Sequence, residues 1–282
     1  GAGAGLTGGG LARRRGRYRL PPLRYDSSFP GGLWRWGHTD WHAATLAVYP
    51  GFTRLRRLDL PLGTRFRQEM NTSRRLVRAA LEFHGCREYR DGDVLRHVHP
   101  RSSARLGIPV VKEFQAEGRG RTAVVVDTWR APWPVGALLP QRDPVEQVLS
   151  LAAAVIDALG RTDRVLELLA AGPGIYRFVS AGRTGYVEEA LEILAAVESC
   201  RQDPLVSLEP LLMDEIRSIQ SVCLLLTRWD KPRADLVARL RDWQVGLKVL
   251  LVWQRGLPPP DLPEEVVCLP ARAVRRGEVI EI

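Results

Sequence analysis

Apolar residues in the second half of the chain come in short continuous runs that alternate with longer amphipathic stretches. The run at 123–126 is apolar throughout, which is typical of a strand in the middle of a parallel sheet. Asp143 followed by Pro144 and Glu146 indicates a helix start, and apolar side chains then recur at helical spacing as far as Leu159. Further elements are predicted as strands at 165–169, 175–179, 221–227, 247–253 and 266–269 and as helices over 185–198 and 233–243.

This alternation of strands and helices predicts an α/β fold. We expect residues 121–282 to form a three-layer, Rossmann-type domain with its ligand edge at the carboxyl ends of the strands. The strands at 165–169 and 175–179 flank an Ala-Gly-Pro-Gly turn and are predicted to form a hairpin.

The first sixty residues have a different pattern, with short apolar runs separated by Pro, Gly and Asp-Ser turns. About four strands fit between Tyr18 and Leu60, which predicts a partial β-sandwich over 1–60, truncated at its N-terminus. Trp34, Trp36 and Trp41 lie close together in sequence and are expected to close the hydrophobic end of this sandwich. The alternative is that they form, with the neighbouring arginine, a stacking platform for bases or sugars.

Residues 61–120 are predicted to be a linker with a short helix, followed by the most densely charged part of the chain. Asp91-Gly92-Asp93 indicates a tight turn inside a set of Arg–carboxylate pairs. We expect Arg87 and Arg105 to reach Asp93 from two directions and to lock this segment onto the α/β sheet. Its charged residues are Arg87, Glu88, Arg90, Asp91, Asp93, Arg96, Arg101 and Arg105.

Several motifs, in the same order along the chain, resemble the bacterial family called "domain of unknown function 58". They are EF…REYRDGD…R…H…SAR…VKEF from residue 82, Arg-Gly-Arg-Tyr-Arg-Leu at 15–20, and Leu-Ala-Val-Tyr-Pro at 46–50. Pro100 departs from the family, which usually has Trp there. The resemblance makes a family signature of Arg87, Glu88, Tyr89, Gly92, Asp93 and Arg105.

The resemblance implies a β-sandwich joined to a von Willebrand A-like domain. It also implies a partner, an AAA+ ATPase of the MoxR type, and two membrane helices before Arg13. We therefore expect a bacterial protein at the cytoplasmic face of the membrane, anchored there in its full length. No stretch of this chain reaches the roughly 18 apolar residues that a spanning helix needs.

A von Willebrand A-like domain implies a candidate Mg²⁺ site at the top of the sheet. Oxygen ligands would come from Asp127 after the first strand, Thr184 before a later helix, and an acid after the fourth strand, where Asp230 stands two residues late. Trp129 and Ala131 replace the two hydroxyls of the usual D-x-S-x-S motif. The site is therefore predicted to be degenerate and to hold no cofactor, Mg²⁺ being the one metal that it could bind.

An arginine is expected to take the place of the metal. Arg228 stands where the third loop should carry its acid, so we expect Asp127 to be held by Arg228 or by backbone amides. Phosphate-cradling and nucleophile-elbow motifs are missing, and Trp129 stands where a haloacid-type phosphatase needs an acid. The sequence thus predicts a non-enzymatic scaffold or adaptor that works with the ATPase in assembly or maturation of a protein complex.

The charge distribution supports a second hypothesis. Residues 1–105 hold 20 basic against 8 acidic side chains, whereas the whole chain has a net charge of +9. Such an excess favours an anionic membrane or an acidic partner, although an arginine-rich, GC-rich genome would produce it too. The alternative function is therefore binding of nucleic acid or an anionic surface through residues 13–24 and 54–78. The four cysteines are scattered, which indicates free thiols in a reducing compartment.

Overall fold

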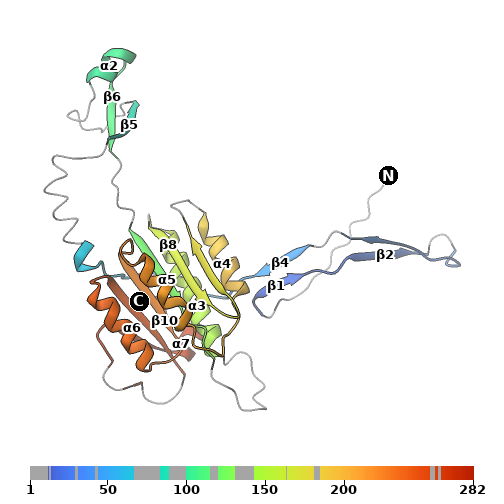
Figure 1. Ribbon diagram of the computed structural model, residues 1–282. Coiled ribbons are helices and arrows are strands. Elements are labelled where there is room, and N and C mark those ends of the chain that lie inside the picture. The colour runs from blue at the N-terminus through green and yellow to red at the C-terminus, as the bar shows by residue number, and fades with distance from the viewer. Residues whose placement is uncertain are drawn as a thin grey trace.

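A six-stranded sheet forms the centre of the computed structural model. The structure describes residues 12, 14–28, 31–41, 44–66, 83–88, 100–114, 120–130, 143–162, 164–180, 185–254, 258–259 and 262–282. The sheet has the order β12-β11-β10-β7-β8-β9, and every strand is parallel to its neighbours except β9, which runs antiparallel to β8 (Figure 1). Its strands are β7 (Arg121–Val126), β8 (Val165–Ala171), β9 (Ile175–Val179), β10 (Ser221–Leu226), β11 (Gly246–Trp253) and β12 (Val266–Pro270).

This order is that of a doubly wound sheet. Counted along the chain from β7, the six strands lie in the order 3-2-1-4-5-6, so the chain moves outward on one side and returns to the middle before building the other. The reversal falls between β7 and β10. The predicted α/β fold is confirmed at this level, and the predicted strands and hairpin lie within a few residues of the observed ones.

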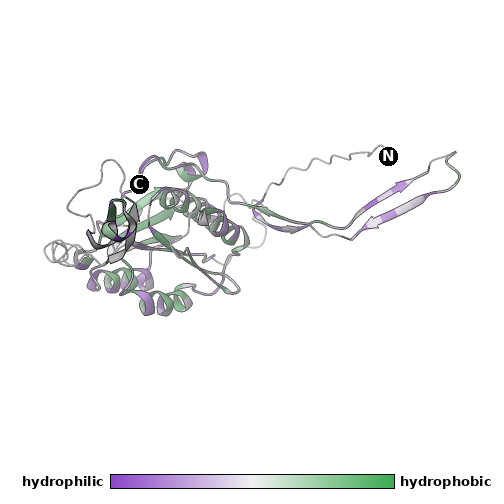
Figure 2. Ribbon diagram, turned by 90° about the horizontal axis from the view of Figure 1, so that it is seen from above, coloured by the Kyte–Doolittle hydropathy of each residue, from purple (hydrophilic) through white to green (hydrophobic). Residues whose placement is uncertain are grey.

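Helices cover both faces of the sheet. One hydrophobic core joins α3, α4 and α7 to one face, and a second joins α5 and α6 to the other (Figure 2). Val124 belongs to the first core and Val125 to the second, because successive side chains of a strand point to opposite faces. The helices are α3 (Pro144–Gly160), α4 (Tyr186–Ala196), α5 (Leu205–Glu215), α6 (Lys231–Asp242) and α7 (Ala271–Arg276).

Two of these helices begin at an aspartate followed within two residues by proline. Asp143 accepts a hydrogen bond from the backbone N–H of Val145 at 3.1 Å, as the sequence predicts for the start of α3. Helix α6 begins two residues earlier than predicted, because Asp230 caps it and accepts from the N–H of Arg233 at 3.3 Å. This cap turns the side chain of Arg233 toward the end of β10.

The segment before residue 61 belongs in part to the α/β unit. Leu55 and Leu60 are buried in the first core, beside α3 and α7. The N–H of Arg56 donates to the carbonyl of Ile280 at 2.7 Å, so the segment also pairs with the C-terminal residues. The assignment of the whole stretch 1–60 to a sandwich is therefore wrong for these residues, whose apolar side chains complete the α/β core.

The N-terminal strands form a ribbon. β1 pairs with β4 and β2 with β3, both antiparallel, and the ribbon projects from the α/β domain in two views (Figures 1 and 2). Among the described residues no second sheet faces it, so the described strands form a ribbon without an opposite layer. Trp34, Trp36 and Trp41 are exposed rather than buried, since a two-stranded ribbon has no opposite layer to cover them. The strands are β1 (Gly16–Arg19), β2 (Leu23–Ser27), β3 (Trp36–Asp40) and β4 (Thr45–Val48).

Arg15 fixes the base of the ribbon to the α/β domain. Its guanidinium donates to the carboxylate of Glu146 at 2.9 and 3.0 Å and to the carbonyls of Leu194 and Val197 at 2.8 and 2.6 Å. The carbonyls lie at the end of α4, where a helix leaves its last acceptors unpaired. The base is therefore held on the domain by charge-assisted hydrogen bonds.

The charged segment also stands away from the sheet. β5 (Phe83–Glu88) pairs with β6 (Val110–Phe114), and α2 (Pro100–Leu106) lies beside β6, where the N–H of Val110 donates to Ser103 Oγ at 2.9 Å. The pair projects from the α/β domain (Figure 1) and Arg105 is exposed, so the predicted lock onto the sheet is wrong for this residue. Tyr89, Gly92 and Asp93 lie outside the described residues, and for Arg87 and Glu88 only the backbone is described.

Within the described ranges, no helix is both long and apolar enough to cross a membrane.

Candidate functional site at the carboxyl edge of the sheet

The two central strands bring Asp127 and Thr227 together. Asp127 follows β7 and Thr227 follows β10, and these neighbouring strands flank the point at which the strand order reverses. Ligands of doubly wound folds bind at this point of the sheet. The N–H of Asp127 continues the ladder by donating to the carbonyl of Leu225 at 2.8 Å, so its side chain is placed directly over the strand ends.

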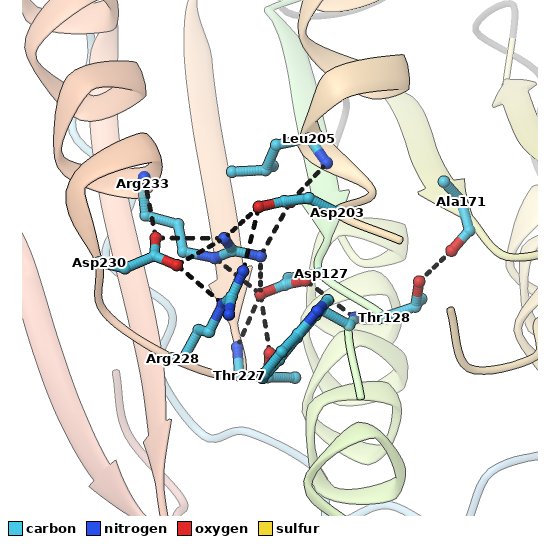
Figure 3. A network of polar contacts seen from close by, with 10 residues as sticks. Asp127, Thr128, Ala171, Asp203, Leu205, Thr227, Arg228, Asp230 and Arg233 are labelled. Carbon is cyan, nitrogen blue, oxygen red and sulfur yellow. Dashed lines mark hydrogen bonds and ion pairs between the residues drawn. The ribbon is translucent and has the colours of Figure 1, made fainter. Parts of the chain in front are cut away.

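Both oxygens of the buried Asp127 carboxylate are occupied. Oδ1 accepts from the N–H of Trp129 at 2.9 Å. Oδ2 accepts from the N–H and the hydroxyl of Thr227 at 3.2 and 2.8 Å, and from Nε and Nη2 of Arg233 at 3.1 and 3.0 Å (Figure 3). The predicted role of backbone amides is confirmed. The predicted arginine is wrong, because Arg233 and not Arg228 contacts this carboxylate.

Arg233 is fully buried and joins three carboxylates. Besides Asp127, it contacts Asp203 through Nη1 and Nη2 at 2.8 and 3.1 Å, and Asp230 through Nη1 at 3.1 Å. Burial lowers the pKa of the Arg233 guanidinium, but the charges of Asp127 and Asp203 outweigh it and raise the pKa above its ordinary value. A planar guanidinium can donate in several directions at once, which a lysine ammonium cannot match. Arg233 is therefore the centre of the site.

Arg228 lies at the outer side of the same site. Its Nη2 is 3.1 Å from Asp203 Oδ2 and its Nε is 2.8 Å from Asp230 Oδ2. Its Cζ lies 3.5 Å from the centroid of the Trp129 ring, a cation–π contact. Trp129, which replaces the first hydroxyl of the usual metal motif, thus holds a cation by its ring face.

Asp203 was not predicted from the sequence as a site residue. Partial burial raises the pKa of its carboxyl. The hydrogen bonds from Arg233 and from the N–H of Leu205, together with the charges of Arg233 and Arg228, lower the pKa by more than burial raises it. The net pKa lies below its ordinary value, so Asp203 is ionised at neutral pH. Three carboxylates then face two guanidinium groups, which leaves this cluster with a net charge of −1.

The arrangement disfavours a metal at Asp127. Four of its five hydrogen bonds converge on Oδ2, and Arg233 already supplies the positive charge that Mg²⁺ would bring. Asp230 serves as a helix cap and an arginine partner, whereas Thr184 and Ala131 lie outside the described residues. In the part of the chain that the structure describes, no three His, Cys, Asp or Glu side chains are arranged to hold a metal ion.

A second buried charge lies within the sheet and has a structural role. Glu167 of β8 is fully buried and pairs with Arg121 of β7 at 2.9 Å and with Arg177 of β9 at 3.2 Å. Both arginines also contact Glu215 at the end of α5, at 3.1 and 2.8 Å. The four residues tie the antiparallel edge hairpin to the centre of the sheet and to the helix that covers it.

No model of a known protein family matches the chain, and a comparison with curated proteins gives no significant match. The fold and the site define its class in structural terms. It is a mixed α/β protein with a mostly parallel six-stranded sheet, in which a buried arginine and three aspartates occupy the edge where such folds bind ligands.

Proposed function

We propose that the protein is a non-enzymatic scaffold or adaptor built on a von Willebrand A-like domain. The observation that carries this proposal is the occupation of the ligand edge by Arg233. Its guanidinium lies where a bound cation would neutralise Asp127, and it contacts two further carboxylates. Asp127 is fully buried, is paired with Arg233 and accepts five hydrogen bonds, so it is suited to holding two strands and a helix together rather than to general-base catalysis.

The partner that we propose is an AAA+ ATPase of the MoxR type, with the pair working in assembly or maturation of a protein complex near the membrane. The partner comes from the resemblance to the family described above. What supports a docking role in this chain is the position of the signature segment, which projects from the α/β domain as the β5–β6 pair with α2 (Figure 1). Arg105 is exposed on α2 and so is accessible to a partner.

Co-purification with the ATPase in its ATP-bound and ADP-bound states tests the proposal. We expect the chain to bind one nucleotide state, and we expect Arg105→Glu to abolish binding without changing the melting temperature. Arg272→Glu makes the same charge change at an exposed position of α7 and should bind as the wild type does. If neither nucleotide state recovers the chain, the adaptor function is refuted. If both variants bind equally well, the ATPase docks elsewhere.

A further inference from the structure

The tip of the N-terminal ribbon presents large apolar side chains to solvent. Leu33, Trp34 and Trp36 are 87%, 82% and 79% exposed. A soluble domain normally buries such side chains, and a group of them at one place marks an interaction site. They lie at the far end of the ribbon from the α/β domain (Figures 1 and 2), so none of the described helices is placed to cover them.

A backbone hydrogen bond lies at the tip, between β2 and β3. The N–H of Gly32 donates to the carbonyl of Ser28 at 2.9 Å. Gly31 and Gly32 have φ of +83° and +71°, a backbone conformation that favours glycine. The chain therefore reverses just before Leu33 and Trp34, so these side chains lie on the end of the ribbon.

The ribbon as a whole is basic. Between residues 14 and 49 the described residues include six arginines and two aspartates, a net charge of +4. Arg17 and Arg19 lie in β1, toward the base, whereas Arg35 lies at the tip between Trp34 and Trp36 and makes no ion pair with any described residue. An apolar end that carries an unpaired cation complements a surface that is apolar inside and anionic outside.

We propose that the ribbon inserts its tip into the interface of an anionic lipid bilayer. Tryptophan is enriched at membrane interfaces, leucine favours the hydrocarbon below, and Arg35 lies where it can contact lipid phosphates. The twelve residues from Gly16 to Ser27 can extend over about 40 Å, so the tip can reach the headgroups ahead of the α/β domain.

The same features fit the other candidate occupants less well. Single-stranded nucleic acid is bound in a basic groove with aromatic platforms, whereas this tip is a convex turn and Leu33 offers no flat face for stacking. A second copy of the chain would bring two unpaired Arg35 side chains together, which opposes pairing of the tips. The bilayer is the occupant that both the apolar tip and Arg35 complement.

Co-flotation of the full chain with lipid vesicles tests this inference. The chain should bind vesicles of phosphatidylcholine with phosphatidylserine, and it should bind vesicles of phosphatidylcholine alone much more weakly. Trp34→Ala with Trp36→Ala should weaken binding at least about tenfold. Arg35→Gln should weaken it about fivefold on the anionic vesicles. Since these side chains are exposed, the melting temperature should stay the same.

Two variants of the α/β domain serve as matched controls. Val206→Ser removes an apolar side chain that is 76% exposed on α5, and Arg272→Gln removes an exposed arginine of α7. Both should bind vesicles as the wild type does. Brominated lipid should quench the tryptophan fluorescence of the wild type, and this quenching should be lost in the variant that lacks Trp34 and Trp36.

Three results would overturn the inference. The first is no binding to anionic vesicles at low salt. The second is that the chain does not bind vesicles but binds a single-stranded oligonucleotide, and that the tryptophan variant loses this binding. The third is self-association that the tryptophan variant abolishes, which would make a second copy the occupant. Each of these outcomes leaves the ATPase test untouched, because that test depends on α2.

Discussion

Arg233→Met tests whether the buried guanidinium holds the carboxyl edge of the sheet together. The methionine side chain is unbranched like that of arginine and fits a buried position, but it removes the charge and the donors. Asp127, which is also fully buried, would keep its bonds to Trp129 and Thr227 and lose its only cationic partner among the described residues. Leaving a buried charge without its partner costs about 3 to 5 kcal/mol.

Two companion variants separate charge from geometry. Arg228→Met removes a side chain that is 30% exposed and touches two of the same aspartates, so it should cost about 1 kcal/mol or less. Arg233→Lys keeps one positive charge but cannot reach three carboxylates in one plane, so its cost should fall between those of the other two variants.

Urea unfolding followed by circular dichroism measures the three costs as changes in the free energy of unfolding, provided that the slopes agree among the variants. The expected order is Arg233→Met, then Arg233→Lys, then Arg228→Met. A loss below about 1 kcal/mol for Arg233→Met would refute the reasoning, because an exposed ion pair would behave in that way.

Three further predictions concern other parts of the chain. The pKa of Asp203 is lowered in the folded chain, so the stability that Asp203 contributes is present above its unfolded pKa and is lost as pH falls. The unfolding free energies of Asp203→Asn and wild type should therefore converge as the pH falls below about 4. Burial raises the pKa of the Cys223 thiol to about 12, so iodoacetamide at pH 8 should alkylate Cys223 only after unfolding, as peptide mass spectrometry would show. Arg105→Ala should cost less than about 1 kcal/mol in thermal or urea unfolding, since Arg105 is exposed; a loss of several kcal/mol would restore the interdomain lock that the sequence suggested.

The α/β domain was predictable because its local signals agree with its packing. The apolar run of β7 lies between two helical layers, and the cap at Asp143 starts α3 as expected. The turn between β8 and β9 is short enough to fix a hairpin. The order of the strands was not worked out from the sequence, because it depends on pairing between segments far apart in the chain.

The site was predicted only in part. The sequence placed Asp127 at the right strand end and predicted an arginine beside it, but it chose Arg228 from its position in the loop. The available signal for Arg233 was its place three residues after the cap Asp230, on the first turn of α6. No local pattern marks Asp203, whose role depends on the approach of α5 to the two central strands.

The expected burial of the N-terminal tryptophans was wrong for a different reason. Alternating strands and clustered tryptophans are typical of a sandwich edge, and four strands did form at 16–48. The sequence pattern describes one layer only, and the opposite layer that a sandwich needs does not lie against these strands among the described residues.

The most direct test of the central claim is the response of the purified chain to Mg²⁺. If Arg233 takes the place of a metal beside Asp127, thermal melting should give the same midpoint with and without Mg²⁺. Asp127→Ala should then lower that midpoint equally in both conditions, because the aspartate acts through stability alone. A midpoint that rises with Mg²⁺, and a rise that Asp127→Ala abolishes, would contradict the claim and make this edge of the sheet a working metal site.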